Sequence, residues 1–373
     1  MVVTADAIVI GAGIIGSSIA LELARTGHRV AVVDKGPGPG QGSTSASSAI
    51  MRFNYSTYPG VATAWESLHC WQGWRDHLEA DAGLDLASYA RTGVVMLDVP
   101  VAPRDRAVSL FRSVGVPYEE WDAATLQRRV PAIDPGRYWP PKRIDDELFW
   151  TEATTTLGAV FTPDGGFIDD PLLATVNLAD AAARNGVQFH FKRAVARIRQ
   201  TGGHVTGVDT DDGEKIEAPV VVNAAGPWSS RLNALAGVGS DFTMTVRPMR
   251  QEVHQVVAPP GYSGDDHPGP VVADLDLGIY VRPAPGGFML VGGTEPACDR
   301  LDWVDDPDLA DPHRTVALFE TQVTRAARRF PQLGVPPQPT GIAGVYDVTS
   351  DWAPVYDRTE LDGYYVAIGT SGN

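Results

Sequence analysis

The sequence predicts an α/β fold with a parallel sheet and helices packed against it, and two stretches of the chain carry this prediction. In the first, residues 7–10 form an apolar run that a glycine-rich turn joins to a helical stretch ending at Arg25, and a second strand pattern follows at 29–33, apolar from Val30 on. In the second stretch, the apolar residues 219–223 run into a turn of small residues and then a helical pattern. Short apolar strands that alternate with helices are typical of a parallel sheet with both faces covered.

The turn after the first strand has the spacing Gly-x-Gly-x-x-Gly and predicts a dinucleotide site. Gly11 allows the tight turn, Gly13 leaves room for a pyrophosphate beside the backbone, and Gly16 lets the helix pack closely on the strand. The N-terminus of that helix offers N–H groups and a partial positive charge to phosphates. Asp34 follows the second strand and can accept hydrogen bonds from ribose hydroxyls, which favours FAD or NAD over NADP because a 2′-phosphate would repel it. The alternative is a glycine-rich turn without a ligand.

Length, charge and cysteine content limit the class of protein. A chain of 373 residues is long enough for about two domains. The formal net charge of −16 and the pI near 4.8 argue against nucleic-acid and anionic-membrane partners. Two cysteines cannot form a disulfide framework, which indicates a reducing compartment. The apolar N-terminus lacks a basic leading region and carries Asp6, so we interpret it as a strand rather than a signal peptide and expect a cytoplasmic protein.

The first half of the chain then alternates loops and helices. Pro/Gly-rich residues 35–42 predict a loop, and the Ser/Thr-rich residues 43–48 supply hydroxyls and can open a helix, although a plain linker is the alternative. The remaining elements expected here are a helix over 60–80, a strand over 93–97, helices over 103–114 and 123–130, and an irregular proline-rich segment over 131–141.

A second α/β unit begins near Gly165. Asp170 and Pro171 have the residue types of an N-cap and a first helical position, and the helix is expected to end at Arg184, before Gly186. The later elements expected are strands over 187–191, 194–198, 205–209, 219–223, 243–258, 278–282, 288–291, 341–346 and 364–368, with a helix over 312–329.

Taken together, these motifs resemble the FAD-dependent amino-acid and secondary-amine oxidoreductases, the family of D-amino-acid oxidase, glycine oxidase, sarcosine oxidase and dimethylglycine dehydrogenase. The resemblance covers the whole chain and is nearest to the sarcosine-oxidase-like branch. It rests on the N-terminal turn and on the segments 42–44, 50–55, 222–228, 278–283, 292–294 and 369–372.

The resemblance implies two domains. A Rossmann-like, glutathione-reductase-type FAD domain would combine residues 1–50, 160–240 and 340–373. A mixed-sheet α+β substrate domain would combine residues 51–159 and 241–339, which gives a D-amino-acid-oxidase-like architecture.

The fingerprint and the resemblance together assign the cofactor contacts. The residues expected to touch FAD are Gly11, Gly13, Ile14, Ile15, Gly16, Asp34, Lys35, Gly42, Ser43, Thr44, Ser45, Ser48, Ala49, Val195, Ala224, Ala225, Gly226, Trp228, Gly344, Gly369, Ser371, Gly372 and Asn373. Relatives attach FAD through a cysteine at the position of Gly344 or a histidine at that of Ala46; since neither residue is present, the resemblance implies non-covalent FAD.

The resemblance also implies a substrate site. Arg52 matches the arginine that binds the substrate carboxylate, and a guanidinium suits this task because it forms bidentate, charge-assisted pairs. Tyr280 and Arg282 lie on the strand expected to face the flavin; each of these three residues has a structural role as its alternative. The expected reaction is hydride transfer from an amino acid or N-methyl amine to flavin N5, followed by hydrolysis of the imine.

Several points stay open on the sequence alone. A lysine that promotes reaction with oxygen in relatives matches the apolar Met289 or Leu290, so the electron acceptor is either O₂ or another molecule. In relatives a substrate-facing lysine follows the terminal motif, beyond Asn373. Alternatives to an amine substrate are a 2-hydroxy acid, an NAD-dependent dehydrogenase, or a flavin-binding subunit of a larger oxidase. Neither paired histidines nor a Gly-x-Ser-x-Gly motif occurs, so we expect no metal site and no serine hydrolase.

Overall fold

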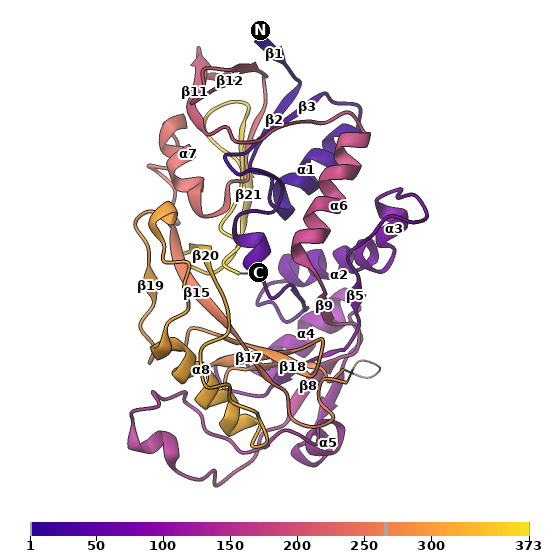
Figure 1. Ribbon diagram of the computed structural model, residues 1–373, viewed down its shortest axis with the longest axis vertical. Helices are drawn as coiled ribbons and strands as arrows, with labels where there is room; N and C mark the ends of the chain where they lie inside the picture. The colour runs from indigo at the N-terminus through magenta and orange to yellow at the C-terminus, as the bar shows by residue number, and fades with distance from the viewer. Residues whose placement is uncertain (1, 265–267, 373) are drawn as a thin grey trace.

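The computed structural model describes residues 2–264 and 268–372. In Figure 1 a parallel sheet with α1 and α6 occupies the upper half, and a larger, mostly antiparallel sheet occupies the lower half with α4, α5 and α8. The helices of the described residues are α1 (Ile14–Arg25), α2 (Tyr58–Gln72), α3 (Trp74–His77), α4 (Arg104–Val114), α5 (Ala123–Arg129), α6 (Pro171–Arg184), α7 (Ser229–Ala236) and α8 (Val316–Arg329), with 3₁₀ turns η1 (Ser43–Ala46), η2 (Glu147–Trp150), η3 (Gly226–Trp228) and η4 (Pro307–Leu309). None of these helices is long and apolar enough to cross a membrane.

The parallel sheet has the strand order β10-β3-β2-β14-β22-β21, in which only β21 runs antiparallel to its neighbour. Its strands are β2 (Ala7–Ile10), β3 (Val30–Val33), β10 (Gln188–His190), β14 (Val221–Asn223), β21 (Val355–Arg358) and β22 (Tyr364–Ile368). Both strand–helix motifs found in the sequence therefore lie side by side, because β2 and β14 are direct neighbours. Their glycine-rich and alanine-rich turns leave the same edge of the sheet.

Both faces of the parallel sheet are buried, which explains the continuous apolar runs in its strands. Val9 and Val32 point to the face covered by α1 and α6, whereas Ile8 and Val33 point to the opposite face, which a small second sheet and α7 cover. All four side chains have no solvent exposure, and burying each stabilises the fold by roughly 1.5–3 kcal/mol. The strands of the small sheet are β1 (Val2–Thr4), β13 (Lys215–Glu217), β12 (His204–Thr210) and β11 (Val195–Thr201).

The large sheet lies below the parallel sheet in the view of Figure 1. Its strand order is β19-β15-β18-β17-β16-β6-β8-β7. Its strands are β6 (Val94–Leu97), β7 (Glu119–Trp121), β8 (Ala159–Thr162), β15 (Val246–Val257), β16 (Val271–Asp274), β17 (Ile279–Ala284), β18 (Phe288–Gly293) and β19 (Asp302–Trp303). A three-stranded sheet of β4 (Ile50–Met51), β9 (Gly166–Ile168) and β5 (Tyr89–Ala90) lies beside it. Helix α8 packs its apolar side, including Phe319 and Val323, onto the core of the large sheet.

Strand β20 (Gly341–Thr349) bears on the expected division into domains. It pairs along its whole length with β15, whereas the later strands β21 and β22 belong to the parallel sheet. The segment 340–373 thus contributes to both sheets, and the division into an FAD domain and a substrate domain stays a prediction.

The structure differs from the sequence-based expectation at several elements. The single helix expected over 60–80 is two helices, α2 and α3, because Gly73 leaves the helical conformation between them (φ −105°, ψ 37°). Strands β8 and β16 lie in the large sheet but were not predicted, since short apolar runs such as Val271-Val272 without alternation give no clear period. Strand β11 extends beyond the expected 194–198 because its antiparallel partner β12 continues the ladder to Thr201.

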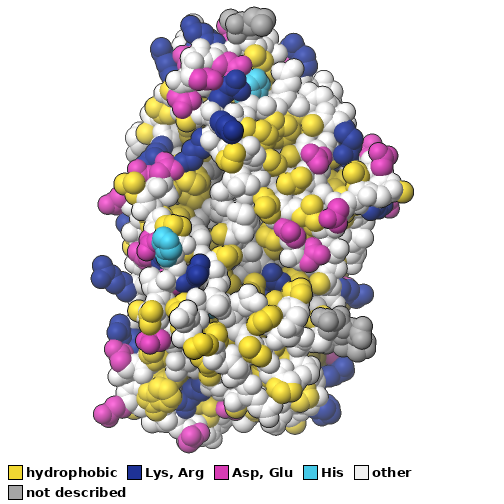
Figure 2. Space-filling model, in the orientation of Figure 1, with side chains coloured by type: hydrophobic (Ala, Val, Ile, Leu, Met, Phe, Trp, Pro, Cys, Tyr) yellow, Lys and Arg dark blue, Asp and Glu magenta, His cyan; other side chains and the backbone are white. Residues whose placement is uncertain are grey.

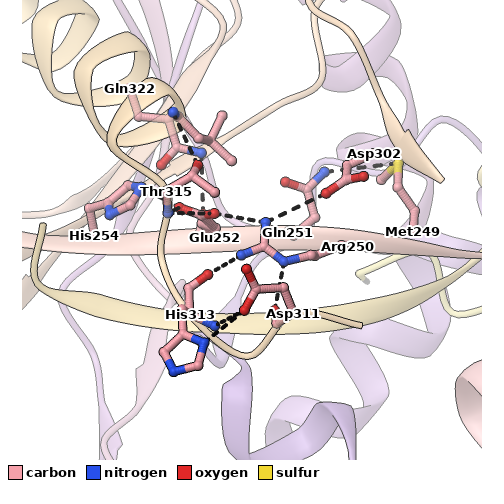
Figure 3. A network of polar contacts seen from close by, with 11 residues as sticks. Met249, Arg250, Gln251, Glu252, His254, Asp302, Asp311, His313, Thr315 and Gln322 are labelled. Carbon is pink, nitrogen blue, oxygen red and sulfur yellow. Dashed lines mark hydrogen bonds and ion pairs between the residues drawn. The ribbon is translucent and has the colours of Figure 1, made fainter. Parts of the chain in front are cut away.

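A buried polar network fixes β15 to the start of α8 (Figure 3). Glu252 is 1% exposed; its carboxylate lies 2.7 Å from the guanidinium of Arg250 and accepts hydrogen bonds from the Thr315 N–H at 3.0 Å. Burial opposes ionisation, but hydrogen bonds from His254, Thr315 and Arg250 hold the pKa of this carboxyl below its usual value. The network therefore orients the long strand that carries β20 on its edge.

Candidate functional site

A cavity of about 1450 Å³ opens where the turns of the parallel sheet meet the large sheet. Ordinary ligand pockets hold roughly 300–1,000 Å³, so this cavity has room for a dinucleotide and a small second molecule. In Figure 2 hydrophobic side chains and uncharged atoms of other residues cover much of the middle of the visible face, and charged side chains lie mostly toward its periphery. The lining comes from the turn after β2, η1, α2, the turn after β14, and the ends of β18, β20 and β22.

The turn between β2 and α1 brings backbone to the cavity wall. Gly11 has φ +107°, and a Cβ atom there would lie 2.4 Å from the carbonyl oxygen of Ala224, so the turn requires glycine. A Cβ atom at Gly16 would lie 1.9 Å from the carbonyl oxygen of Gly11, so only glycine at this position lets helix α1 pack directly against the turn. Gly13 lines the cavity, and the hydroxyl of Thr44 accepts a hydrogen bond from the Ile14 N–H at 3.2 Å. The Ser/Thr-rich loop is therefore packed against the N-terminus of α1.

Asp34 lines the same cavity and also stabilises the turns around it. Its carboxylate accepts hydrogen bonds from the backbone N–H groups of Ala12 at 2.7 Å and Gly36 at 2.6 Å. These contacts fix the acid beside the glycine turn, as a ribose-binding carboxylate requires.

A cluster of Lys35, Trp228, Arg231 and Asp308 lines the cavity near Asp34. The ammonium of Lys35 lies 3.9 Å above the ring of Trp228 and forms an ion pair with Asp308. Trp228 donates from Nε1 to Asp308 at 3.0 Å, and Arg231 lies 3.3 Å from the same carboxylate. The loop containing η4 thus reaches across from the large-sheet side to the turn after β14.

The structure brings most of the predicted cofactor residues to one cavity. Those that line it are Gly11, Gly13, Ile14, Ile15, Asp34, Lys35, Gly42, Ser43, Thr44, Ser48, Ala49, Val195, Ala224, Ala225, Gly226, Trp228, Ser371 and Gly372. Among the described residues predicted for the cofactor, Gly16, Ser45, Gly344 and Gly369 are not part of the lining. Asn373 lies outside the described residues.

Gly344 and Ala46 contact one another. A Cβ atom at Gly344 would lie 2.7 Å from the Cβ of Ala46, so any larger side chain at 344 requires η1 to move. The hydroxyl of Ser43 donates to the backbone oxygen of Val345 at 2.5 Å and holds η1 against β20. The two positions at which the resemblance places covalent attachment residues therefore pack together here.

Arg52, Tyr280 and Tyr346 line the part of the cavity next to the large sheet. The guanidinium of Arg52 lies 4.4 Å from the ring centroid of Tyr55 and donates to the backbone oxygen of Asn54 at 3.2 Å. The hydroxyl of Tyr280 is hydrogen-bonded to that of Ser48, and burial raises the pKa of the phenols of Tyr280 and Tyr346. This end of the cavity therefore combines a cation with neutral hydroxyl donors.

Arg282 does not line the cavity, although it was predicted beside Tyr280. It is 6% exposed and its guanidinium lies 4.3 Å from the ring centroid of Phe167. Burial lowers the pKa of this guanidinium to about 10. The contact of Arg282 with Phe167 ties β17 to β9.

Sequence reasoning did not single out two further side chains in the lining, Tyr346 and Glu295. Tyr346 lies two residues after Gly344 on β20, and because side chains in a strand alternate, this spacing could have placed it on the same face. Glu295 directly follows the Gly292-Gly293-Thr294 motif, but nothing in its local pattern distinguishes it from a surface acid.

Comparisons with known proteins match these features. A sequence model of the family described as "FAD dependent oxidoreductase" matches residues 6–373. Glycine oxidase from Geobacillus kaustophilus is 27% identical over 375 residues, which cover 98% of this chain and 87% of that protein. D-amino acid dehydrogenase from Methylobacterium nodulans is 26% identical over 406 residues, covering 97% of this chain and 90% of that protein. The crystal structure of L-proline dehydrogenase from P. horikoshii superimposes with a TM-score of 0.80 at 23% identity, covering 100% of this chain and 89% of that chain.

The superposition confirms the fold class predicted from the sequence. The family match decides between the two dinucleotides that the glycine turn and Asp34 left open, and the size of the cavity and its glycine-lined wall fit the larger of them. The chain belongs to the family of FAD-dependent oxidoreductases, whose cofactor is FAD.

Proposed function

We propose that this chain oxidises the C–N bond of an amino acid or of a secondary, N-methyl amine, with FAD bound non-covalently. One observation carries the proposal: a single cavity joins the glycine turn and Asp34 to Arg52 and Tyr280. The relatives named glycine oxidase and D-amino acid dehydrogenase support an amino-acid substrate.

The residues of the cavity suit such a substrate in defined roles. Arg52 would bind the carboxylate through charge-assisted hydrogen bonds. The hydroxyl of Tyr280, supported by Tyr346, would position the nitrogen end of the substrate. When bound, FAD supplies the two-electron acceptor, and the imine product is hydrolysed by water.

An absorption spectrum of the purified protein, repeated after acid precipitation, tests the attachment of the cofactor. Flavin bands that move into the acid supernatant support non-covalent FAD, whereas colour that stays with the pellet contradicts it.

An anaerobic screen tests the substrate class. The panel contains glycine, N-methylglycine, D- and L-amino acids and matched 2-hydroxy acids, and bleaching of the flavin is the readout. Bleaching by amines alone supports the proposal, and bleaching by hydroxy acids alone replaces it with a hydroxy-acid oxidoreductase. Reoxidation of the bleached enzyme by O₂ or by an artificial dye then separates an oxidase from a dehydrogenase.

The role of Arg52 is tested by Arg52→Ala. We expect KM for a carboxylated amine to rise at least tenfold, a loss of about 1.4 kcal/mol of binding. An unchanged KM contradicts a carboxylate contact. Arg91→Ala is the matched control, because Arg91 is half exposed and pairs with Asp164 outside the cavity lining.

A further inference from the structure

Glu295 occupies an unusual position at the end of β18, and its side chain lines the cavity beside the large sheet. Its backbone has φ +50°, in the left-handed region that side chains other than glycine rarely adopt. Such conformations are strained and persist where the surrounding structure enforces them, often at functional sites.

The two glycines at the end of β18 lie next to Tyr280 and Glu295. A Cβ atom at Gly292 would lie 2.2 Å from Cζ of Tyr280, directly across the β17–β18 ladder. A Cβ atom at Gly293 would lie 3.5 Å from Oε1 of Glu295. Glycine is therefore required at 292, where the ring of Tyr280 occupies the space of a side chain, whereas the carboxyl group of Glu295 lies at ordinary contact distance from position 293.

The groups that face Glu295 come from several elements. The negative charge of Glu295 helps to raise the pKa of Tyr280 on β17 and of Tyr346 on β20, and the positive charge of Arg52 acts in the opposite direction on the pKa of Tyr346. Asp299 is the nearest acid, and it is held by Arg325 of α8 at 2.5 Å. Among residues 2–264 and 268–372, no Lys, Arg or His nitrogen lies within 4.0 Å of the Glu295 carboxylate. Within the described chain, this acid therefore has no basic side chain as an ion-pair partner.

A carboxyl group in this environment favours the binding of a cationic ligand. Burial, and secondarily the charge of Asp299, raises the pKa of Glu295 to about 8. A positively charged ligand beside it would offset the cost of desolvating the carboxylate. Arg52 lines the same cavity and offers the complementary charge for a carboxylate. The cavity thus contains an acidic side chain, Glu295, for the ammonium group of a zwitterionic amino acid and a cationic side chain, Arg52, for its carboxylate.

We propose that Glu295 binds the amine nitrogen of the substrate and removes its proton, so that this pocket selects amines over hydroxy acids. This inference rests on the proposed function. The step is balanced: the carboxylate of Glu295 and a protonated amine become the carboxylic acid and the neutral amine. The N–H bond breaks, an O–H bond forms, and the nitrogen lone pair becomes available for oxidation of the neighbouring C–H bond.

The experiment uses holoenzyme whose flavin is kept reduced under anaerobic conditions, so that ligands bind without turnover. Calorimetry gives the Kd of N-methylglycine and of propionate, which has a carboxylate but no nitrogen, from pH 6 to pH 10. We expect Glu295→Gln to weaken N-methylglycine binding at pH 8.5 at least tenfold and to change propionate binding less than twofold. Glu320→Gln, an exposed glutamate on α8, is the matched control and leaves both affinities unchanged.

Proton accounting separates a proton acceptor from a merely structural residue. At pH 9 the wild type transfers the amine proton to Glu295 and releases almost none to buffer, whereas Glu295→Gln releases about one proton per ligand, since aliphatic amines with pKa near 10 are still protonated there. Calorimetry in two buffers of different ionisation enthalpy measures this number. Equal proton release by the wild type and the variant overturns the proposal.

The wild type alone gives the same test if the variant does not fold. Its affinity for N-methylglycine should level off above about pH 8, because both partners are then in their binding forms. An affinity that keeps improving tenfold per pH unit up to pH 10 overturns the role of Glu295. If the anaerobic screen finds no amine that bleaches the flavin, the proposed function itself fails. If amines bleach the flavin but the proton release is unchanged in Glu295→Gln, only this inference fails.

Discussion

The hydroxyl oxygens of Ser48 and Tyr280 lie 2.7 Å apart, although 232 residues separate them in the chain. Ser48 belongs to the loop that follows the first strand–helix–strand unit, and Tyr280 belongs to the centre of the large sheet. Their hydrogen bond joins this loop to the large sheet and fixes the direction of the phenol. The geometry of the substrate end therefore depends on a contact between both halves of the molecule.

Removing this hydroxyl in Tyr280→Phe tests the contact. We expect the free energy of unfolding to fall by about 1 kcal/mol, the usual net value of one hydrogen bond. We also expect kcat/KM for the amine substrate to fall about tenfold, equivalent to about 1.4 kcal/mol. Steady-state kinetics and urea denaturation measure the two effects. Ser48→Ala is the comparison variant, because it removes the same hydrogen bond but keeps the phenol hydroxyl in the cavity, so kcat/KM should fall less. Wild-type kinetics in Tyr280→Phe would place this residue away from the reacting atoms.

Gly13→Ala is expected to weaken FAD binding at least tenfold, or about 1.4 kcal/mol. The added Cβ would lie 3.2 Å from Oγ1 of Thr44, on the wall that the pyrophosphate is expected to approach. The backbone of Gly13 has φ −72°, which alanine adopts without strain, so the stability of the apoprotein should change little. Flavin fluorescence during titration of apoprotein gives the Kd. Gly38→Ala is the matched control, since a Cβ there meets nothing within 4 Å. Equal losses in both variants would contradict a cofactor contact at Gly13.

The buried network on β15 predicts a large stability loss for Glu252→Ala. The substitution leaves the guanidinium of Arg250, only 5% exposed, without its nearest carboxylate. Breaking a buried pair on one side typically costs 3–5 kcal/mol, and we expect a loss of about this size in urea denaturation. Asp302→Ala removes the second, more exposed carboxylate, 3.5 Å from the same guanidinium, and should cost no more than about 1 kcal/mol. Similar losses in the two variants would show that burial of Glu252 adds nothing to the pair.

Glu295 also makes stability depend on pH. Its pKa is about 8 in the folded chain, against 4.5 for an ordinary glutamate, so between these values the folded state holds a proton that the unfolded state has lost. The free energy of unfolding therefore decreases as pH rises through this window. In Glu295→Gln this contribution is absent. The free energy of unfolding of the variant relative to that of the wild type should therefore increase by more than about 1.4 kcal/mol, the equivalent of one pKa unit, between pH 5 and pH 8.5. Urea denaturation at both pH values checks this; parallel losses in the two proteins would contradict the raised pKa.

The local pattern of the sequence was sufficient for five of the six strands of the parallel sheet, whereas β21 was not predicted. The conformations of Gly11 and Gly16 follow from a motif six residues long, because strand, turn and helix are neighbours in the chain. Strand β16 could not be predicted in the same way, since its pairing with β6 joins residues far apart and its four residues carry no period. Long-range contacts decide such elements.

The substrate end of the cavity shows a similar limit. Tyr280 and Arg282 share one face of β17, yet only Tyr280 reaches the cavity, because alternation defines the face and not the distance along it. Glu295 owes its raised pKa and its left-handed backbone to the packing of several elements, which no local pattern encodes.

The close packing of Gly344 against Ala46 has a consequence for how the protein is maintained. With no nucleophile at either position, we expect cofactor and chain to associate reversibly, so the loaded fraction follows the free FAD concentration. A ligand that binds only the folded state stabilises it by about 2.7 kcal/mol when its concentration is a hundred times Kd. Resistance to heat and to proteolysis would then rise and fall with the concentration of free FAD. Dilution would release FAD and so destabilise the folded chain without any chemical change to its residues.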